Sequence, residues 1–137
     1  MPQDNTVAYT NDFPQDKVNL FTLSEFALLD VSSGLETVGE KDVLRELLIC
    51  LINEALTADV AKMRAAYTEN NWDKVQQLAH KIKGGAVYVG TIRLKMACQY
   101  LERYWKTGQN ELLEPLYQQA LTVIDETVIA VSSWLKS

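Results

Sequence analysis

A long stretch of the chain, from about Glu40 to Glu69, contains neither glycine nor proline. Its apolar residues recur every three or four positions, a spacing that places side chains on one face of an α-helix. That apolar face consists of Leu44, Leu48, Leu51, Ile52, Ala55, Met63 and Ala66. The stretch is therefore predicted to form one long amphipathic helix that covers a core.

Three further segments have the same spacing. Asn71 is the preferred N-cap of a helix from about Trp72 to Val89, and Gly90 ends that helix. Thr91 is expected to cap the next helix, which stops at Thr107-Gly108. The last helix begins either near Glu114, or at Glu111 with a bend at Pro115, because proline fits only the first turn of a helix. The apolar faces are Val75, Leu78, Ile82, Ala86 and Val89; then Leu94, Ala97, Cys98, Leu101, Tyr104 and Trp105; and last Leu116, Ala120, Val123, Ile124, Thr127, Val131 and Trp134.

Helices joined by such short links favour antiparallel neighbours. We therefore expect an all-α fold, an antiparallel up-and-down four-helix bundle with one or two short extra N-terminal helices. Capping-box spacing predicts such short helices at Thr22 with Glu25, and at Ser33 with Glu36, the second ending at Gly39. Residues 1–20 are polar and are expected to form a flexible tail or linker, which leaves residues 21–137 as the bundle domain.

Charge and composition exclude several classes of function. The 137 residues carry a net charge of −5, which argues against a nucleic-acid-binding surface. No apolar run approaches the roughly 20 residues that span a bilayer, and no signal peptide is evident, so a cytoplasmic protein is expected. A single histidine and no cysteine pair at ligand spacing leave too few ligands for an intrinsic zinc site.

The single histidine, His80, lies on the polar side of its helix, roughly 160° from the centre of the apolar face at about 100° per residue. Its imidazole is therefore expected to point to water. Gly84 lies one turn further along, where a glycine weakens the helix by about 1 kcal/mol and opens room beside the ring. Lys83 can direct its ammonium to the same place. An exposed neutral imidazole is a competent nucleophile, and a nearby ammonium would complement an attached phosphoryl group.

The run His80-Lys81-Ile82-Lys83-Gly84-Gly85-Ala86, followed by Val89-Gly90, resembles the motif of histidine-containing phosphotransfer (HPt) domains. The likeness covers about residues 30–137, and Gly85 departs from it mildly, since relatives commonly have serine or alanine there. The resemblance implies that His80 accepts a phosphoryl group from a phosphoaspartate of a receiver domain and passes it to an aspartate of a response regulator. Lys83 would then stabilise the phosphate, and Gly84 would give the partner access.

Other residues around His80 have possible supporting roles. Gln77 could orient the imidazole, while Lys81 and Arg93 could add positive potential. The expected docking surface also includes Gln76, Val87 and Tyr88. The expected partners are the receiver domain of a hybrid sensor histidine kinase, a response regulator, or both, with no nucleic acid and no membrane insertion, and the protein is expected to be a monomer.

The sequence lacks a glycine-rich phosphate loop, so a phosphoryl carrier is expected rather than an enzyme with kinase activity of its own. It has no carboxylate cluster around His80, so the Mg²⁺ that phosphoryl transfer needs is expected from the receiver, and no cofactor of its own. One alternative is a helical adaptor that binds a signalling partner without accepting phosphate. An unrelated enzyme has little support, because no second general acid or base is evident near His80 beyond Asp73.

Overall fold

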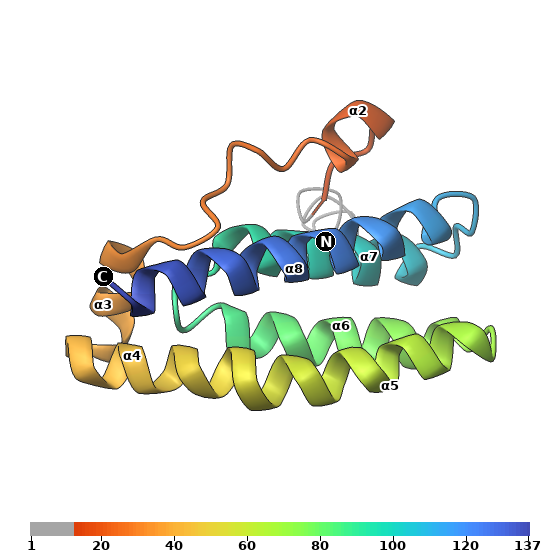
Figure 1. The fold of residues 1–137 in the computed structure, drawn as a ribbon. Coiled ribbons are helices and arrows are strands. Elements are labelled where there is room, and N and C mark those ends of the chain that lie inside the picture. Colours follow the sequence, from red (N-terminus) through yellow and green to blue (C-terminus); the bar gives the residue numbers. More distant parts are fainter. Residues whose placement is uncertain (1–12) are drawn as a thin grey trace, which may run out of the picture.

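The computed structural model describes residues 13–137, and every regular element in that range is helical. Four long helical segments run alternately up and down (Figure 1). The first passes without a break through α4 (Lys41–Cys50), the π-helical segment η1 (Leu51–Ala55) and α5 (Leu56–Thr68); the others are α6 (Trp72–Ala86), α7 (Ile92–Lys106) and α8 (Leu113–Leu135). The predicted all-α antiparallel four-helix bundle is confirmed.

The predicted apolar faces fill the core, with one local exception in the first long segment. Leu44, Leu48 and Met63 are fully buried, as expected. Ala55 is exposed, whereas the next residue, Leu56, is buried. The reason is the π-helical segment, whose wider turn holds one more residue and so shifts the register of every position that follows. The placement of Ala55 in the core was therefore wrong.

The helix ends show how much of the capping was predictable. The Asn71 side chain accepts a hydrogen bond from the Lys74 amide (3.1 Å), as its cap role requires. Gly90 has a φ of +79°, a conformation that favours glycine, and it lies in the turn before α7. Thr91 occupies the N-cap position of α7 but makes no cap hydrogen bond, and its buried hydroxyl instead donates to the Ala86 carbonyl (3.0 Å).

The sequence allowed the last helix to begin either near Glu114 or at Glu111. In the structure, α8 begins at Leu113. Pro115 therefore lies in the first turn, where its missing N–H removes no intrahelical hydrogen bond. The start agrees with the alternative near Glu114 and not with a helix that begins at Glu111.

Two short helices precede the bundle. The expected helix ending at Gly39 is α3 (Val31–Val38), which crosses one end of the bundle (Figure 1). Its N-cap is Asp30, which accepts from the Ser33 amide (3.0 Å), so the assignment of that role to Ser33 was wrong. The helix expected after Thr22 does not form; instead α2 (Lys17–Leu20) precedes it, and the Thr22 hydroxyl donates to the Val18 carbonyl.

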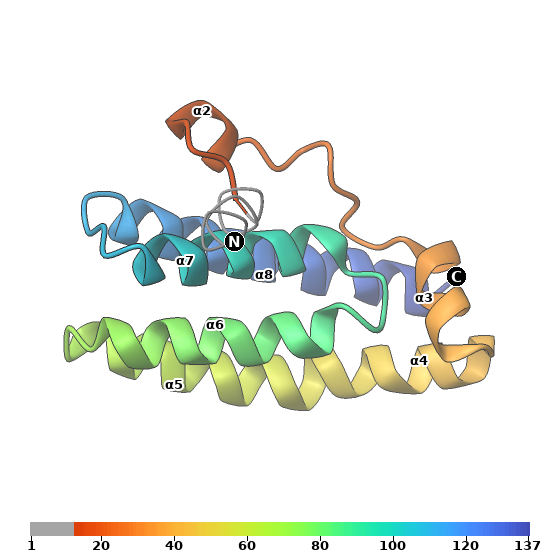
Figure 2. The ribbon, with the colours of Figure 1, turned by 180° about the vertical axis from the view of Figure 1, so that it is seen from behind.

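The segment before α3 packs against the bundle. Phe13, Leu20 and Leu23 are buried in the common core, and Gln119 of α8 donates to the Leu20 carbonyl (3.0 Å). Figure 2 shows this segment running along the α7 side towards α3. Residues 13–20 of the expected flexible tail are therefore held on the bundle, and residues 1–12 lie outside the described residues.

Candidate functional site

His80 lies just past the middle of α6, and its side chain is 63% exposed. The buried side of α6 carries Val75, Leu78, Ala79, Ile82 and Ala86. Because a helix turns by about 100° per residue, the position of His80 falls outside this buried arc. The predicted exposure of the imidazole is confirmed.

A carboxylate from the next helix holds one nitrogen of the ring. His80 Nδ1 lies 2.9 Å from Glu102 Oε2, and the Glu102 side chain, on α7, is fully buried. An ionised carboxylate can only accept hydrogen bonds, so Nδ1 must carry the proton and donate it. The lone pair of the imidazole therefore resides on Nε2, the nitrogen that Glu102 does not contact.

Two lysines keep Glu102 ionised in spite of its burial. Lys83 Nζ donates to Oε1 and Lys106 Nζ donates to Oε2, each at 2.9 Å. Burial raises the pKa of Glu102, but the hydrogen bonds from Lys83 and Lys106, together with the charges of Lys83 and His80, outweigh it and lower that pKa to about 2. The Glu102 cluster, defined as His80, Lys83, Glu102 and Lys106, thus joins α6 to α7 through one shared carboxylate.

A row of exposed positions runs along α6 through the histidine. Gln77, Gly84 and Val87 lie three residues before and four and seven residues after His80, and all three are exposed. A Cβ atom added to Gly84 would meet no heavy atom within 4 Å, and Gly84 keeps an ordinary helical conformation. The space beside the imidazole is therefore open, as the sequence predicted; the roles of Gln77 and Gly84 remain predictions.

Two residues expected on this exposed face are turned towards the interior. Gln76 is buried, with its amide donating to Asp73 (2.9 Å), and the Lys83 side chain is only 14% exposed. By helical rotation both lie on the side of His80 that faces α7, whereas Gln77 and Gly84 lie on the other side. The expected exposure of Gln76 on the docking surface was wrong, and Lys83 is bound to a carboxylate rather than free in water.

Lys81, Val87 and Tyr88 complete the surroundings that the sequence singled out. Lys81 is exposed and donates to the buried carboxylate of Asp59 on α5 (3.0 Å), so its charge is partly matched. Val87 and Tyr88, in the turn after α6, are 46% and 59% exposed. This pair is an apolar patch that a protein partner could cover, which keeps the predicted docking role open.

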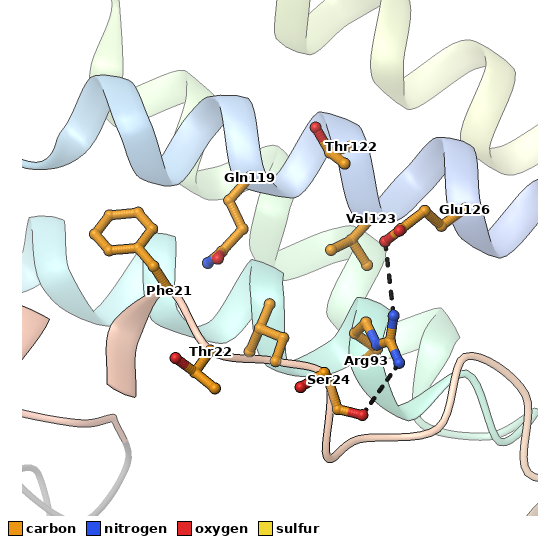
Figure 3. Close-up of a pocket in the computed structure, with 9 residues that line it drawn as sticks. Phe21, Thr22, Ser24, Arg93, Gln119, Thr122, Val123 and Glu126 are labelled. Carbon is orange, nitrogen blue, oxygen red and sulfur yellow. Dashed lines mark hydrogen bonds and ion pairs between the residues drawn. The ribbon is translucent and has the colours of Figure 1, made fainter. Parts of the chain in front are cut away.

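Arg93 does not belong to this site. Its guanidinium donates to the carbonyls of Phe26 and Ser24 and lies 3.7 Å from Glu126. Figure 3 shows the contacts with Ser24 and Glu126 at the edge of a surface cavity of about 440 Å³, which the N-terminal segment forms with α7 and α8. The cavity is lined by Phe21, Thr22, Leu23, Ser24, Arg93, Gln119, Thr122, Val123 and Glu126, none of them in the Glu102 cluster. Arg93 therefore anchors the N-terminal segment, and its suggested contribution to the potential near His80 remains a prediction.

Glu102 and Lys106 were not predicted as site residues from the sequence. The contact of His80 with a titratable side chain was not predicted either. A signal existed, since Glu102 lies one turn after Cys98 and two turns after Leu94, both of them core residues. A charged residue at such a position must be paired when the helix packs, because an unpaired buried charge is too costly. Two of its partners, His80 and Lys83, lie about 20 residues earlier in the chain, and identifying them required the packing of α6 on α7.

No group of three or more possible metal ligands occurs within residues 13–137. Within the same range, no helix has the length and apolar character that crossing a membrane requires.

Comparison with known proteins agrees with this geometry. Residues 46–134 match the family described as the Hpt domain. The signal transduction histidine-protein kinase BarA of Escherichia coli strain K12, and that of Shigella flexneri, are each 29% identical to this chain over 111 residues, which is 80% of the chain and 12% of the relative. The chain thus spans about an eighth of the length of these relatives, and no solved structure gives a significant match. The chain belongs to the Hpt domain family, the histidine phosphotransfer modules of two-component phosphorelays.

Proposed function

We propose that His80 receives a phosphoryl group from the phosphoaspartate of a receiver domain and delivers it to an aspartate of a response regulator. The observation that carries this proposal is the 2.9 Å contact between His80 Nδ1 and the buried, ionised Glu102. It fixes the ring in the tautomer whose Nε2 is nucleophilic while most of the side chain remains open to a partner.

In the forward step, the Nε2 lone pair attacks the phosphorus of the acyl phosphate. The P–Nε2 bond forms as the P–O bond to the receiver aspartate breaks, and that aspartate leaves as a carboxylate. The imidazole gains positive charge in this step, and the adjacent Glu102 carboxylate stabilises it while Nδ1 keeps its proton. The reverse sequence of the same bonds delivers the phosphoryl group to the next aspartate.

The partners and the cation belong to the proposal. Gly84 and the exposed Val87–Tyr88 pair offer a partner close access to Nε2. We expect that partner to be the receiver domain of a hybrid sensor histidine kinase, a response regulator, or both, and to supply the Mg²⁺ that neutralises the transferred phosphoryl group. We expect the chain to act as a monomer and as a carrier that does not use ATP.

The test is transfer of radiolabelled phosphate from a phosphorylated receiver domain to the wild-type chain and to His80→Gln. The wild type is expected to become labelled in an acid-labile form, and His80→Gln is expected to lose all labelling with an unchanged helical circular-dichroism spectrum. Lys62→Gln, which alters an exposed residue of α5, is the control and should be labelled normally.

Two results would contradict the proposal. Labelling of His80→Gln at the wild-type rate would place the phosphoryl group elsewhere. Stable receiver binding by both proteins without any labelling would favour the adaptor, which holds a signalling partner and carries no phosphate.

A further inference from the structure

The two lysines of the Glu102 cluster are not equivalent. Lys83 Nζ binds Oε1, and its side chain is 14% exposed. Lys106 Nζ binds Oε2, the same oxygen that His80 Nδ1 contacts, and its side chain is 40% exposed. Lys106 therefore lies next to the imidazole through a shared oxygen atom and retains more freedom to move.

The charges of the cluster do not cancel before phosphorylation. Glu102 contributes one negative charge, because its pKa of about 2 keeps it ionised at neutral pH, and the two lysines contribute two positive charges. The two lysines and Glu102 together thus leave one positive charge in excess beside the imidazole. A phosphoryl group on Nε2 brings negative charge to this place, and an ammonium is a strong partner for phosphate oxygens.

The more exposed lysine, Lys106, can move to this new negative charge at a smaller energetic cost than Lys83. If Lys83 left Glu102, Oε1 would lose the only ion-pair partner that it has among the described residues. If Lys106 left, Oε2 would retain the His80 Nδ1–H, so the buried carboxylate would keep a donor on each oxygen. The cost of an unsatisfied buried charge therefore favours movement of Lys106.

We propose that Lys106 is the lysine that binds the phosphoryl group on His80, and that it exchanges its bond to Glu102 for a bond to that group. The proposal rests on the proposed function of His80. Lys106 comes from α7, one turn after Glu102, so it lies outside the histidine motif of α6. Lys83 and His80 would meanwhile keep Glu102 in place.

The experiment uses phosphoramidate, a small phosphoryl donor that needs no receiver domain. Nε2 attacks its phosphorus, the P–N bond breaks, and ammonia leaves. The rate of His80 phosphorylation is measured by ³¹P NMR for wild type, Lys106→Gln and Lys106→Arg. Lys62→Gln, which removes a charge from an exposed position on α5, is the matched control. The tautomer of His80 is read from ring ¹⁵N shifts before phosphorylation.

We expect Lys106→Gln to phosphorylate about tenfold more slowly than wild type, the size of effect expected for one charge-assisted hydrogen bond. Lys106→Arg should recover most of the rate, and Lys62→Gln should match wild type. The Nδ1–H tautomer and the melting temperature of Lys106→Gln should remain close to wild type, because Lys83 still holds Glu102.

A wild-type rate in Lys106→Gln would overturn the proposal. A slow rate accompanied by loss of the Nδ1–H tautomer would also overturn it, because Lys106 would then act through Glu102. A chain that phosphoramidate labels but no phosphorylated receiver labels would contradict the proposed relay function alone, and the variants would still decide the role of Lys106.

Discussion

Helix α6 contacts a buried carboxylate on each side, and the two contacts differ in their partners. On one side, Lys81 binds Asp59 of α5 at 3.0 Å; on the other, His80 binds Glu102 of α7 at 2.9 Å. Both pairs are separated by 22 residues in sequence. Within residues 13–137, Asp59 forms an ion pair with Lys81 alone, whereas Glu102 also binds Lys83 and Lys106.

The difference separates an ion pair between helices from a chemical site. Lys81 is exposed and binds Asp59 through an ammonium that has no free lone pair, so this bond joins two helices and offers no nucleophile. Glu102 contacts the only imidazole in the sequence, a nucleophilic ring, and Lys83 and Lys106 keep the carboxylate ionised. If this contrast is right, equivalent substitutions on the two sides of α6 must differ in their effects on stability and on phosphoryl transfer.

The largest contrast is expected between Glu102→Gln and Asp59→Asn. Loss of the Glu102 charge leaves two lysines without their shared partner and frees the imidazole, so stability should fall by on the order of 2–3 kcal/mol. Asp59→Asn keeps a hydrogen-bond acceptor for a mostly exposed lysine and should cost about 1 kcal/mol. Urea denaturation measures both losses, and phosphoramidate labelling should be slowed only in Glu102→Gln. Equal losses of stability and of labelling in Glu102→Gln and Asp59→Asn would contradict the distinction between the α7 side and the α5 side of α6.

The same contrast should depend on pH. The pKa of Glu102 is about 2 in the folded chain, below its ordinary 4.5, so its ionised form contributes stability at and above about pH 4.5. That contribution is lost as the pH falls from about 4.5 towards 2, because the carboxylate then becomes protonated. The stability difference between wild type and Glu102→Gln should shrink over this range. A difference that stays constant down to pH 2 would contradict the assigned ionisation.

A smaller effect is expected when a lysine of α6 is replaced, and it concerns the rate of phosphoryl transfer. Lys83→Gln should slow phosphoryl transfer to His80 by about tenfold, since it removes a charge-assisted hydrogen bond from the cluster. Lys81→Gln, two positions earlier, should change the rate by less than about twofold, because exposed ion pairs contribute little. Single-turnover labelling by a phosphorylated receiver compares the two variants, and a larger loss in Lys81→Gln would reverse the account.

The smallest effect on the fold is expected for the glycines beside His80. Alanine at Gly84 or Gly85 should raise stability by up to about 1 kcal/mol, because both positions are helical and open around the missing Cβ. Only Gly84 shares the exposed row with His80. Receiver-dependent labelling should therefore fall in Gly84→Ala and stay unchanged in Gly85→Ala, while phosphoramidate labelling stays normal in both. Equal receiver kinetics in the two variants would argue against the access role of Gly84.

Much of this arrangement could be predicted from sequence, because it depends on positions along one helix. The spacing of apolar residues predicted the bundle, and the exposure of His80 followed from its angle to the buried face. The cap at Asn71 and the turn at Gly90 followed from local chemistry. The π-helical segment that exposes Ala55 has no comparable local signal.

The unpredicted part of the site depends on how two helices pack. Glu102 contacts His80 only because α7 lies against one side of α6, and the same packing buries Gln76 and most of Lys83. Sequence spacing within α6 gives the angle of each residue but not the direction from which the neighbouring helix approaches. The tautomer of His80, and with it the reactive nitrogen, became clear only once Glu102 was found beside Nδ1.

The central claim is that Glu102 leaves Nε2 of His80 as the nitrogen that accepts the phosphoryl group. The most direct measurement is ¹H–¹⁵N and ³¹P NMR of the wild-type chain, labelled with ¹⁵N in the imidazole and phosphorylated by a receiver domain. We expect a single phosphorylated species with phosphorus bonded to Nε2 and hydrogen on Nδ1. A phosphoryl group on Nδ1, or a phosphorylated chain in which the His80 ring is unmodified, would contradict it.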